Sequence, residues 1–459
     1  MKKGLGRIKT GKFERRMSML RAGFSAGARL AGRSATNLIN TSENRKTGHK
    51  KILREEADRF VEQIGQLKGS VVKIGQMMAL WGEHYLPEEV TLALHQLEDQ
   101  TSPVDWEVIK VTLEQELDQS LLDELEIDPQ PIGAASLGQV HKATRKADGA
   151  KLCLKIQYPA IADAIETDLD AVSTLMKLFR LAPNTKEFDL WFAEIRDLLR
   201  REVDYKLEAD TTRRFDERFQ DDDRFIVPKI FERYSTQKVL CLSFEQGVPI
   251  ASQVMRNLSQ ERRNHIAKAC LDVCWMEIFR WGEMQTDPNF GNYLVRINED
   301  APDQLVLLDF GAVRAFEPDI LRAGKKLVSG SLFHQGETIA TALRNIGFYT
   351  SQTPPKVIQH FIEICYVTIE PFVNHDKFPP ENPELIDDAG CYDWAQSRLA
   401  TRTLLRAKDA ALSRHFNVPP KDFMYFSRKL IGTFTLMSVL NAKINGYKVI
   451  QPHLGELDQ

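Results

Sequence analysis

The chain has 459 residues, of which 43% are hydrophobic and 27% are charged, and its formal net charge is −3. This is the composition of an ordinary globular protein, and the length exceeds what one hydrophobic core usually fills, so we expect two lobes. No apolar run reaches the roughly 20 residues of a membrane span, and we expect no secretory signal. The six cysteines form no C-x-x-C pair, so we expect buried free thiols, including Cys270 and Cys274, in a reducing cytosolic environment.

The first 50 residues form a basic arm. Residues 1–54 contain 15 Lys or Arg and 2 Asp or Glu, a net charge of +13, so the remainder of the chain carries −16. Hydrophobic side chains recur in the arm at helical spacing, namely Phe13, Met17, Leu20 and Phe24. This pattern predicts an amphipathic helix that lies on an anionic membrane surface. A solvated basic tail and a mitochondrial transit peptide are the two alternatives.

The rest of the chain alternates between helical and strand-like patterns. The elements that we expect, in chain order, are helices over 51–100, strands over 131–158, helices over 161–219, a short strand pair within 225–244 and a connector at 246–249. Beyond the connector the pattern is mainly helical, with one hairpin over 293–308. We find no internal repeats and no long low-complexity segment, so each element contributes separately to the fold.

The predicted hairpin joins two polar motifs. Asp287 and Asn292 stand five residues apart just before its first strand, and Asp309 opens the D-F-G that ends its second strand. An Asp, an Asn five residues later and a D-F-G across a hairpin follow the order of a protein-kinase catalytic core. In that order Asn292 and Asp309 offer oxygen ligands to Mg²⁺. Asp287 stands where a base accepts a hydroxyl proton.

A kinase core also requires a phosphate-covering hairpin and then a lysine on a strand. Lys155 lies on a strand with alternating polarity, and Gly133, Gly138 and Val140 before it fit the frame G-x-G-x-x-G-x-V. Ala135 occupies the middle glycine position of this frame. Its Cβ restricts how closely the backbone approaches a phosphate, so we expect this loop to hold phosphates differently.

A carboxylate on a following helix is expected to pair with Lys155. The stretch "REVDYKLEAD" offers Glu202, Asp204 and Glu208 on one predicted helix. Taken alone, the same stretch also fits a solvated, charged helix face.

The segment after the D-F-G differs from that of an ordinary protein kinase. No A-P-E follows, and a new helix is predicted near Pro318, only nine residues past Asp309. Little room remains for an activation segment that binds an extended peptide. We therefore expect ATP binding and hydrolysis rather than ordinary protein phosphorylation.

Together these segments resemble the UbiB family of atypical kinase-like proteins, which support ubiquinone biosynthesis. The matching motifs are K-x-G-Q as Lys73-Ile74-Gly75-Gln76, the alanine-rich loop as Gly133-Ala134-Ala135-Ser136, E-x-D as Glu202-Val203-Asp204, and the metal motifs as "QTDPNFGN" and "LLDFGAVR". The resemblance is strong over about residues 60 to 320 and looser over the C-terminal helices. Gly133 departs from the family's first alanine, and Gln285 stands where many members have a histidine.

The resemblance implies an α+β, bilobal, atypical protein-kinase-like fold with an N-terminal helical extension that carries the K-x-G-Q motif. We accordingly divide the chain into a basic arm over 1–50, the helical extension over 51–130, a kinase-like N-lobe over 131–247 and a mainly helical C-lobe over 248–459. The implied catalytic residues are Asp287, Lys73, Glu202 and Asp204. The implied nucleotide contacts are Lys155, Gly133, Ala134, Ala135, Ser136, Gly138, Val140 and Glu208, and the implied metal ligands are Asn292 and Asp309.

The family also implies an unusual place for Lys73, in the nucleotide cleft beside Glu202 and Asp204, where it would restrict docking of a peptide. The alternative is a polar helix stripe that faces solvent.

ATP and Mg²⁺ are the implied cofactors. The implied partners are ATP or ADP, an anionic membrane surface, quinone-precursor lipids and enzymes of ubiquinone biosynthesis, without nucleic acid. The expected location is cytoplasmic, peripheral on the inner face of a membrane, with a mitochondrial location as the alternative. Three functions stay open: an ATPase that supports ubiquinone biosynthesis, a genuine kinase of a small molecule or lipid, and a nucleotide-binding scaffold with little turnover.

Overall fold

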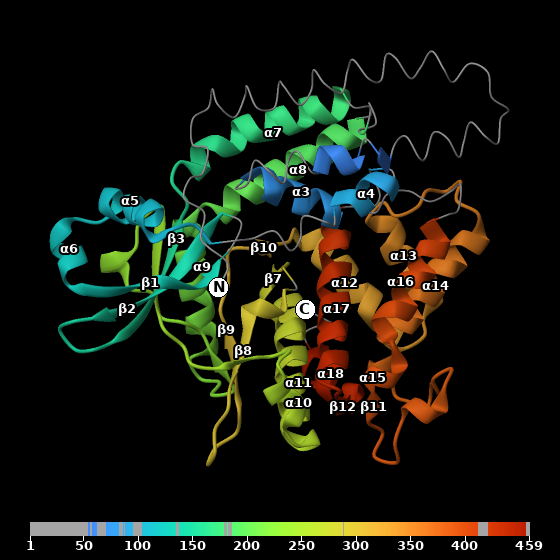
Figure 1. Cartoon of the computed structure of the whole chain (residues 1–459). Coiled ribbons are helices and arrows are strands. Elements are labelled where there is room, and N and C mark those ends of the chain that lie inside the picture. Colours follow the sequence, from blue (N-terminus) through green and yellow to red (C-terminus); the bar gives the residue numbers. More distant parts are fainter. Residues whose placement is uncertain are drawn as a thin grey trace. The chain divides into compact units, whose positions relative to one another are not determined.

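The computed structural model forms two compact units (Figure 1). Unit 1 comprises residues 1–210 and 229–244, and unit 2 comprises residues 211–228 and 245–459. The structure describes residues 54–55, 57–61, 70–81, 86, 88–94, 103–134, 137–178, 181, 186–287, 289–411 and 421–455. The basic arm and its predicted amphipathic helix lie outside the described residues.

A four-stranded antiparallel sheet, in the order β1-β2-β3-β5, forms the strand part of unit 1. Its strands are β1 Leu125–Ala134, β2 Gly138–Arg145, β3 Lys151–Gln157 and β5 Val239–Ser243. β3 buries Leu152, Leu154 and Ile156, the alternation expected of a strand with one face in the core. The edge strand β1 begins earlier than we expected. Its register is irregular around Pro131, and an edge strand tolerates proline at such irregularities.

The helices of unit 1 confirm that helical segments precede β1 and follow β3 along the chain. They are α3 Ser70–Trp81, α4 Glu88–Leu94, α5 Trp106–Glu116, α6 Gln119–Asp123, α7 Ile161–Leu178, α8 Lys186–Glu202 and the first residues of α9 Tyr205–Phe219. Figure 1 shows α7 and α8 side by side with α3 packed against them. α3 buries Val71, Ile74 and Met78, so its apolar stripe faces the other helices.

The single helix predicted across "REVDYKLEAD" was wrong, because two helices meet there. α8 ends at Glu202 and α9 begins at Tyr205. Between them, Asp204 accepts a hydrogen bond from the backbone N–H of Leu207 at 3.1 Å on its side-chain oxygen. Aspartate is a favoured residue before the first turn of a helix, because it satisfies an N–H that has no partner within the helix.

Unit 2 contains a second four-stranded sheet in the order β4-β9-β8-β6 and two small strand pairs. The strands are β4 Phe225–Ile226, β6 Val248–Pro249, β7 Glu283–Gln285, β8 Tyr293–Arg296, β9 Gln304–Leu307, β10 Val313–Ala315, β11 Tyr392–Asp393 and β12 Lys443–Ile444. The predicted hairpin is confirmed as β8 and β9. The predicted strand pair within 225–244 was wrong, since β4 pairs with β9 and β5 pairs with β3. The expected connector at 246–249 contains the edge strand β6.

Helices make up most of unit 2, as expected. They are α10 Gln253–Asn257, α11 Gln260–Trp275, the π-helix η4 Met276–Trp281, α12 Pro318–Leu332, α13 Gly336–Asn345, α14 Pro355–Ile369, α15 Trp394–Ser397, α16 Leu399–Ala411, α17 Lys421–Val439 and α18 Gly446–Leu454. Unit 2 also contains short 3₁₀ turns, namely η5 Phe290–Asn292 between β7 and β8, and η6 Glu370–Phe372 and η7 Pro383–Leu385 between α14 and β11. Cys270 and Cys274 on α11 are free thiols whose burial raises their pKa to about 12 and about 11.

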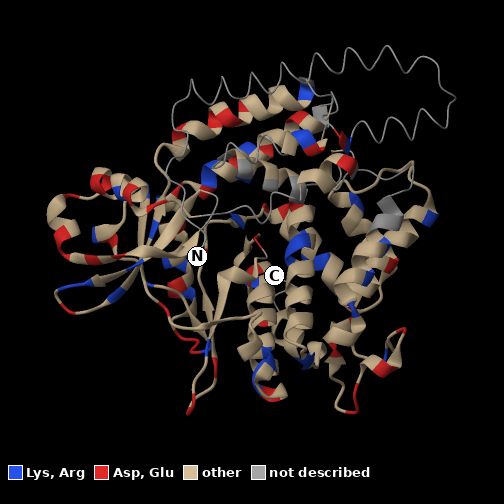
Figure 2. Ribbon diagram, in the orientation of Figure 1, with Lys and Arg blue, Asp and Glu red and all other residues tan. Residues whose placement is uncertain are grey.

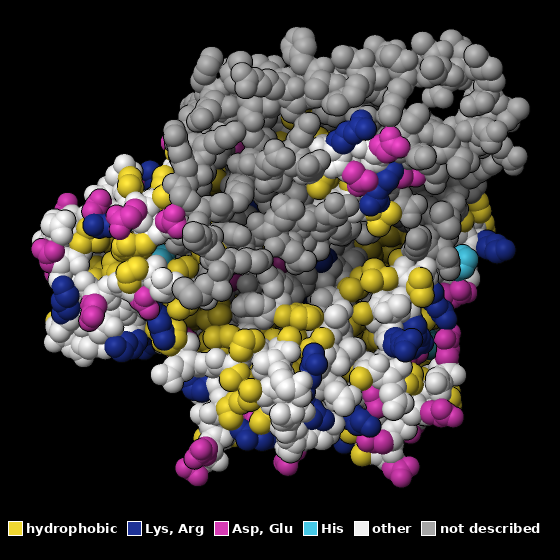
Figure 3. All heavy atoms as spheres, viewed as in Figure 1, with side chains coloured by type: hydrophobic (Ala, Val, Ile, Leu, Met, Phe, Trp, Pro, Cys, Tyr) yellow, Lys and Arg dark blue, Asp and Glu magenta, His cyan; other side chains and the backbone are white. Residues whose placement is uncertain are grey.

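Charge lies mainly on loops and outer helix faces. Figure 2 shows acidic side chains at exposed loop ends of unit 2, including the turn between β8 and β9. In the space-filling view of Figure 3, charged side chains again lie at the loop ends at the bottom of the view, and exposed hydrophobic side chains lie above them. Of the helices that the structure describes, none combines the length and the apolar character of a membrane span.

Candidate nucleotide and metal sites

The sheet of unit 1 brings the predicted nucleotide contacts into one row. Gly133 pairs with Val140 across β1 and β2, and Val140 pairs with Lys155 across β2 and β3. Residues that are directly opposite on antiparallel strands lie about 5 Å apart at Cβ, so the loop and the lysine are neighbours. Ala134 is the next residue of β1, and Ala135 and Ser136 lie outside the described residues.

Gly138 is needed where the loop enters β2. A Cβ atom there would lie 2.5 Å from the carbonyl oxygen of Ile156 and 2.9 Å from the hydroxyl of Tyr205. At Gly133 the nearest atom to an added Cβ is the Cβ of Val140, at an ordinary 4.0 Å. Space alone therefore requires glycine at Gly138 but allows alanine at Gly133.

Lys155 is held by a buried carboxylate. Its Nζ donates to both side-chain oxygens of Glu208, at 2.7 and 2.8 Å, and only 4% of the Glu208 side chain is exposed. The ammonium also lies over the ring of Tyr205, 5.2 Å from its centroid. Of the three carboxylates considered from sequence, Glu208 is the partner, whereas Glu202 and Asp204 have other contacts. The pair fixes a positive charge where a phosphate contact is predicted.

Lys73 and Glu202 form the contact that the resemblance implied. Lys73 Nζ lies 2.7 Å from Glu202 Oε1, with 23% and 29% of the two side chains exposed. The expected contact of Lys73 with Asp204 was wrong. Within the described part of the chain no ion pair joins Lys73 to Asp204, and Asp204 caps α9 instead. Lys73 thus links α3 to the end of α8 within unit 1.

In unit 2 the hairpin brings the three motif residues together. Asn292 Nδ2 donates to Asp287 Oδ2 at 3.2 Å, and its carbonyl oxygen accepts from Leu308 N–H at 3.0 Å. The second bond aligns Asn292 with the end of β9, and Asp309 follows directly. Asp309 in turn accepts from the N–H of Gly311 at 2.9 Å. Side-chain oxygen atoms from both sides of the hairpin, those of Asn292 before β8 and of Asp309 after β9, therefore lie at the same end of the hairpin.

These oxygen atoms suit Mg²⁺, a hard cation that is usually held by one or two carboxylates, substrate phosphates and water. Asn292 donates through its nitrogen and so keeps its side-chain oxygen as a potential ligand beside the Asp309 carboxylate. Among the described residues no three His, Cys, Asp or Glu side chains form a metal cluster. Mg²⁺ held by one or two carboxylates usually completes its coordination with phosphate and water oxygens.

Sequence reasoning missed the role of Gln285, the residue two positions before Asp287. Its side chain bonds both motif loops, since Nε2 donates to the carbonyl oxygen of Asp309 at 2.6 Å and Oε1 accepts from the N–H of Asp287 at 3.0 Å. The side chain is buried. A polar residue at the end of a short strand carries no sequence signal for such a bridge.

Gln139 was also missed, although it lies opposite Ala134 of the alanine-rich loop. Its buried Oε1 accepts from the N–H of Val104 at 3.0 Å, and its Nε2 lies 2.9 Å from His141 Nε2. The other ring nitrogen of His141 lies 2.8 Å from the carbonyl oxygen of Asp128, and burial lowers the pKa of His141. A neutral His141 that donates through Nδ1 and accepts through Nε2 satisfies both contacts, which fixes Gln139 beside the loop.

Comparison with known proteins connects this geometry to a family. Residues 96–341 match the ABC1 atypical kinase-like domain. The chain is 26% identical over 402 residues to the probable serine/threonine-protein kinase abkA of Dictyostelium discoideum, covering 85% of this chain and 69% of that protein. It is 28% identical over 396 residues to the atypical kinase COQ8B, mitochondrial, of Rattus norvegicus, covering 86% and 71%. A solved structure of Rv3197 with erythromycin, from Mycobacterium tuberculosis, shares the fold with a TM-score of 0.59 and 20% identity, over 91% of this chain and 100% of that one.

Proposed function

This chain belongs to the UbiB family of ABC1 atypical kinase-like proteins, and on that premise we propose that it binds and hydrolyses ATP with Mg²⁺. Its α+β, kinase-like fold is shown by the family match and the shared fold, and the K-x-G-Q residues lie on α3. The single observation that carries the proposal is the Lys155–Glu208 pair, at 2.7 Å. In kinase-like folds the phosphate contact is a strand lysine that pairs with a carboxylate on a later helix, and here that carboxylate is Glu208 on α9.

In the proposed mechanism, residues of each unit have separate tasks. Lys155 holds a phosphate of the nucleotide, and the backbone of the alanine-rich loop covers the phosphates. Asn292 and Asp309 would hold Mg²⁺, which when bound would supply positive charge against the transferred phosphoryl group. Asp287 orients the attacking hydroxyl, which in an ATPase is water, and accepts its proton. Asn292 fixes the carboxylate of Asp287 through the 3.2 Å hydrogen bond.

A genuine kinase of a small molecule or lipid is the second candidate. Asp287 favours it, because 40% of its side chain is exposed and a hydroxyl group of a substrate could reach it. In either case we propose that Lys73, bound to Glu202, keeps α3 in place and restricts access for a peptide.

We further propose that the protein supports ubiquinone biosynthesis at a membrane surface. The +13 charge of residues 1–54 supports contact with anionic lipids. The rat relative is named mitochondrial, which supports a mitochondrial location over the cytoplasmic one first expected. Quinone-precursor lipids and the enzymes that process them are the proposed partners.

ATP turnover by the purified full chain tests this proposal. Phosphate release and product phosphorylation are measured with Mg²⁺, with and without anionic liposomes and quinone-precursor analogues. We expect phosphate release that rises with the liposomes and no phosphorylated product. A phosphorylated precursor would favour the kinase, and ATP binding without either product would favour the scaffold.

A further inference from the structure

Glu277 and Lys429 form a buried ion pair in unit 2. Lys429 Nζ, on α17, lies 2.5 Å from Glu277 Oε2, with 5% and 2% of the two side chains exposed. Burial lowers the pKa of Lys429, but Glu277 together with Tyr293 and Cys274 raises it more, while burial raises the pKa of Glu277 itself. Glu277 lies in the π-helix η4 at the end of α11. Single π-helical turns often occur at functional sites, so this pair warrants an explanation.

The other oxygen of Glu277 bonds the start of the catalytic segment. Glu277 Oε1 accepts from the backbone N–H of Gln285 at 3.3 Å. Gln285 is the residue whose side chain bonds both Asp287 N–H and the Asp309 carbonyl. A chain of contacts therefore runs from Lys429 through Glu277 and Gln285 to the two motif loops.

We infer that Glu277, held by Lys429, is a positioning residue that fixes Gln285 and thereby aligns Asp287 and Asp309. This inference deepens the proposed function and rests on it. In the described structure neither Glu277 nor Lys429 has a hydrogen bond or ion pair with Asp287 or Asp309, so both act through Gln285.

Stability alone is a poor explanation for this pair. Removing two charges from water is costly, and hydrophobic residues of similar volume often give equal or higher stability. What a hydrophobic pair cannot supply is an oxygen for Gln285 N–H. A carboxylate with one oxygen on Lys429 and the other on a backbone N–H has a fixed orientation, which is what positioning requires.

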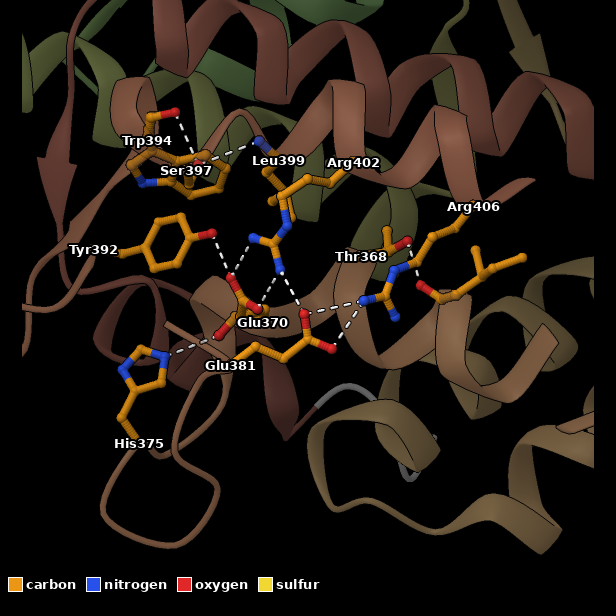
Figure 4. Close-up of polar contacts among 11 residues, drawn as sticks. Thr368, Glu370, His375, Glu381, Tyr392, Trp394, Ser397, Leu399, Arg402 and Arg406 are labelled. Atoms are coloured by element: carbon orange, nitrogen blue, oxygen red, sulfur yellow. Dashed lines mark hydrogen bonds and ion pairs between the residues drawn. The ribbon is translucent and has the colours of Figure 1, made fainter. Parts of the chain in front are cut away.

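The same unit contains a matched control. Glu370 accepts from Arg402 through both oxygens, each at 2.9 Å, and from the hydroxyl of Tyr392 at 2.6 Å (Figure 4). The Glu370 side chain is nearly as buried as that of Glu277, with 7% exposed. Its carboxylate joins η6 to β11 and α16 and has no hydrogen bond to Asp287, Gln285 or Asp309 among the described residues. Disrupting it tests the general cost of losing a buried pair.

Two double variants separate the hydrogen bond from the ion pair. Glu277→Gln with Lys429→Met removes both charges but keeps a side-chain oxygen for Gln285 N–H. Glu277→Leu with Lys429→Met removes that oxygen as well. Glu370→Leu with Arg402→Met is the control. If the leucine variant does not fold, Glu277→Met with Lys429→Met replaces it, because methionine fits irregular core spaces.

Amide hydrogen exchange of the nucleotide-free full chain and steady-state ATP turnover are measured for each variant. We expect the leucine variant to exchange the Gln285 and Asp287 amides about tenfold faster, and to lose about tenfold in kcat with KM within about threefold. In the glutamine variant and in the control, the exchange rates of these amides and the kcat should stay within about threefold of the wild-type values. The inference is overturned if the leucine variant matches the glutamine variant, or if the control is equally impaired. A wild-type chain without turnover would refute the proposed function, while the exchange rates would still decide this inference.

Discussion

Lys155 places one positive charge against a carboxylate that is almost fully buried. Replacing it by alanine removes the predicted phosphate contact and leaves Glu208 without its cation. We expect Lys155→Ala to weaken Mg²⁺-ATP binding and to lower the free energy of unfolding by about 3 kcal/mol, the cost of breaking a buried pair on one side. Calorimetric titration and urea unfolding measure the two effects.

Lys151→Ala is the control for this prediction. Lys151 lies on the same strand and is exposed, and its ammonium donates to the hydroxyl of Thr144 at 2.9 Å. It should leave both quantities nearly unchanged. Equal ATP affinity in the Lys155 and Lys151 variants would remove Lys155 from the nucleotide site.

The same residue shows what sequence could and could not predict. The alternating pattern of β3 identified Lys155, because period-two polarity depends only on the strand itself. The sequence did not decide which of three carboxylates, Glu202, Asp204 or Glu208, pairs with Lys155. Glu208 is selected by a helix break at Asp204 and by burial against the sheet, which depend on contacts distant in sequence. Gln285 and Lys429 were missed for the same reason.

At the scale of the elements, the hairpin of β1 and β2 gives a matched pair of glycines. Gly138→Ala would place a Cβ 2.5 Å from a backbone oxygen, so we expect about 1–3 kcal/mol of destabilisation and weaker nucleotide binding. Gly133→Ala has an ordinary 4.0 Å contact and restores the family's alanine. It should change the free energy of unfolding by less than about 1 kcal/mol. Thermal unfolding with and without Mg²⁺-ATP measures both, and equal losses would contradict the steric argument.

The helix α3 forms an ion pair with the end of α8, between Lys73 and Glu202. Lys73→Ala breaks that pair, but because both side chains are partly exposed we expect a stability cost of only about 1 kcal/mol. ATP turnover should change, and self-phosphorylation should become measurable, while ATP affinity is retained. Lys110→Ala, which breaks the exposed pair with Glu114 on α5, is the control. Wild-type turnover in Lys73→Ala would assign the pair a purely structural role.

Sequence patterns predicted long elements better than short ones. The helices of 161–219 and the β8–β9 hairpin were confirmed, because their periodicity extends over many residues or across a short turn. The pairing of β4 and β5 was wrong. β4 has two residues, and its partner β9 lies far along the chain. Such a short strand is defined by its neighbours in space rather than by its own sequence.

At the scale of the whole molecule, the basic arm makes membrane binding testable. Deleting residues 1–50 removes most of the +13 charge, so we expect the truncated chain to lose most of its binding to anionic vesicles. Binding of the full chain should weaken as salt rises, because salt screens the attraction between charges. Co-sedimentation measures both, with zwitterionic vesicles as the control. Equal sedimentation of the two chains would show that the arm is not the membrane contact.

The fold class of the molecule followed from a few motifs in the correct order, which the family match then confirmed. The division into two units involves residues 211–228, which belong to unit 2 although their neighbours on both sides belong to unit 1. Such an exchange of segments depends on pairing with distant strands and could not be predicted from local patterns. The domain boundaries given from sequence therefore stay predictions.

The most direct test of whether the motif residues bind a metal–nucleotide complex is calorimetric titration with Mg²⁺-ATP. The titration compares three proteins: the wild-type chain, Asp309→Asn and Asp300→Asn. Asp309→Asn removes a charged oxygen ligand, whereas Asp300→Asn makes the same change in the exposed turn of the hairpin. We expect Asp309→Asn to weaken binding at least about tenfold, which is about 1.4 kcal/mol, and Asp300→Asn to bind like the wild type. Wild-type affinity in a folded Asp309→Asn chain would contradict the metal site and the proposed ATP chemistry with it.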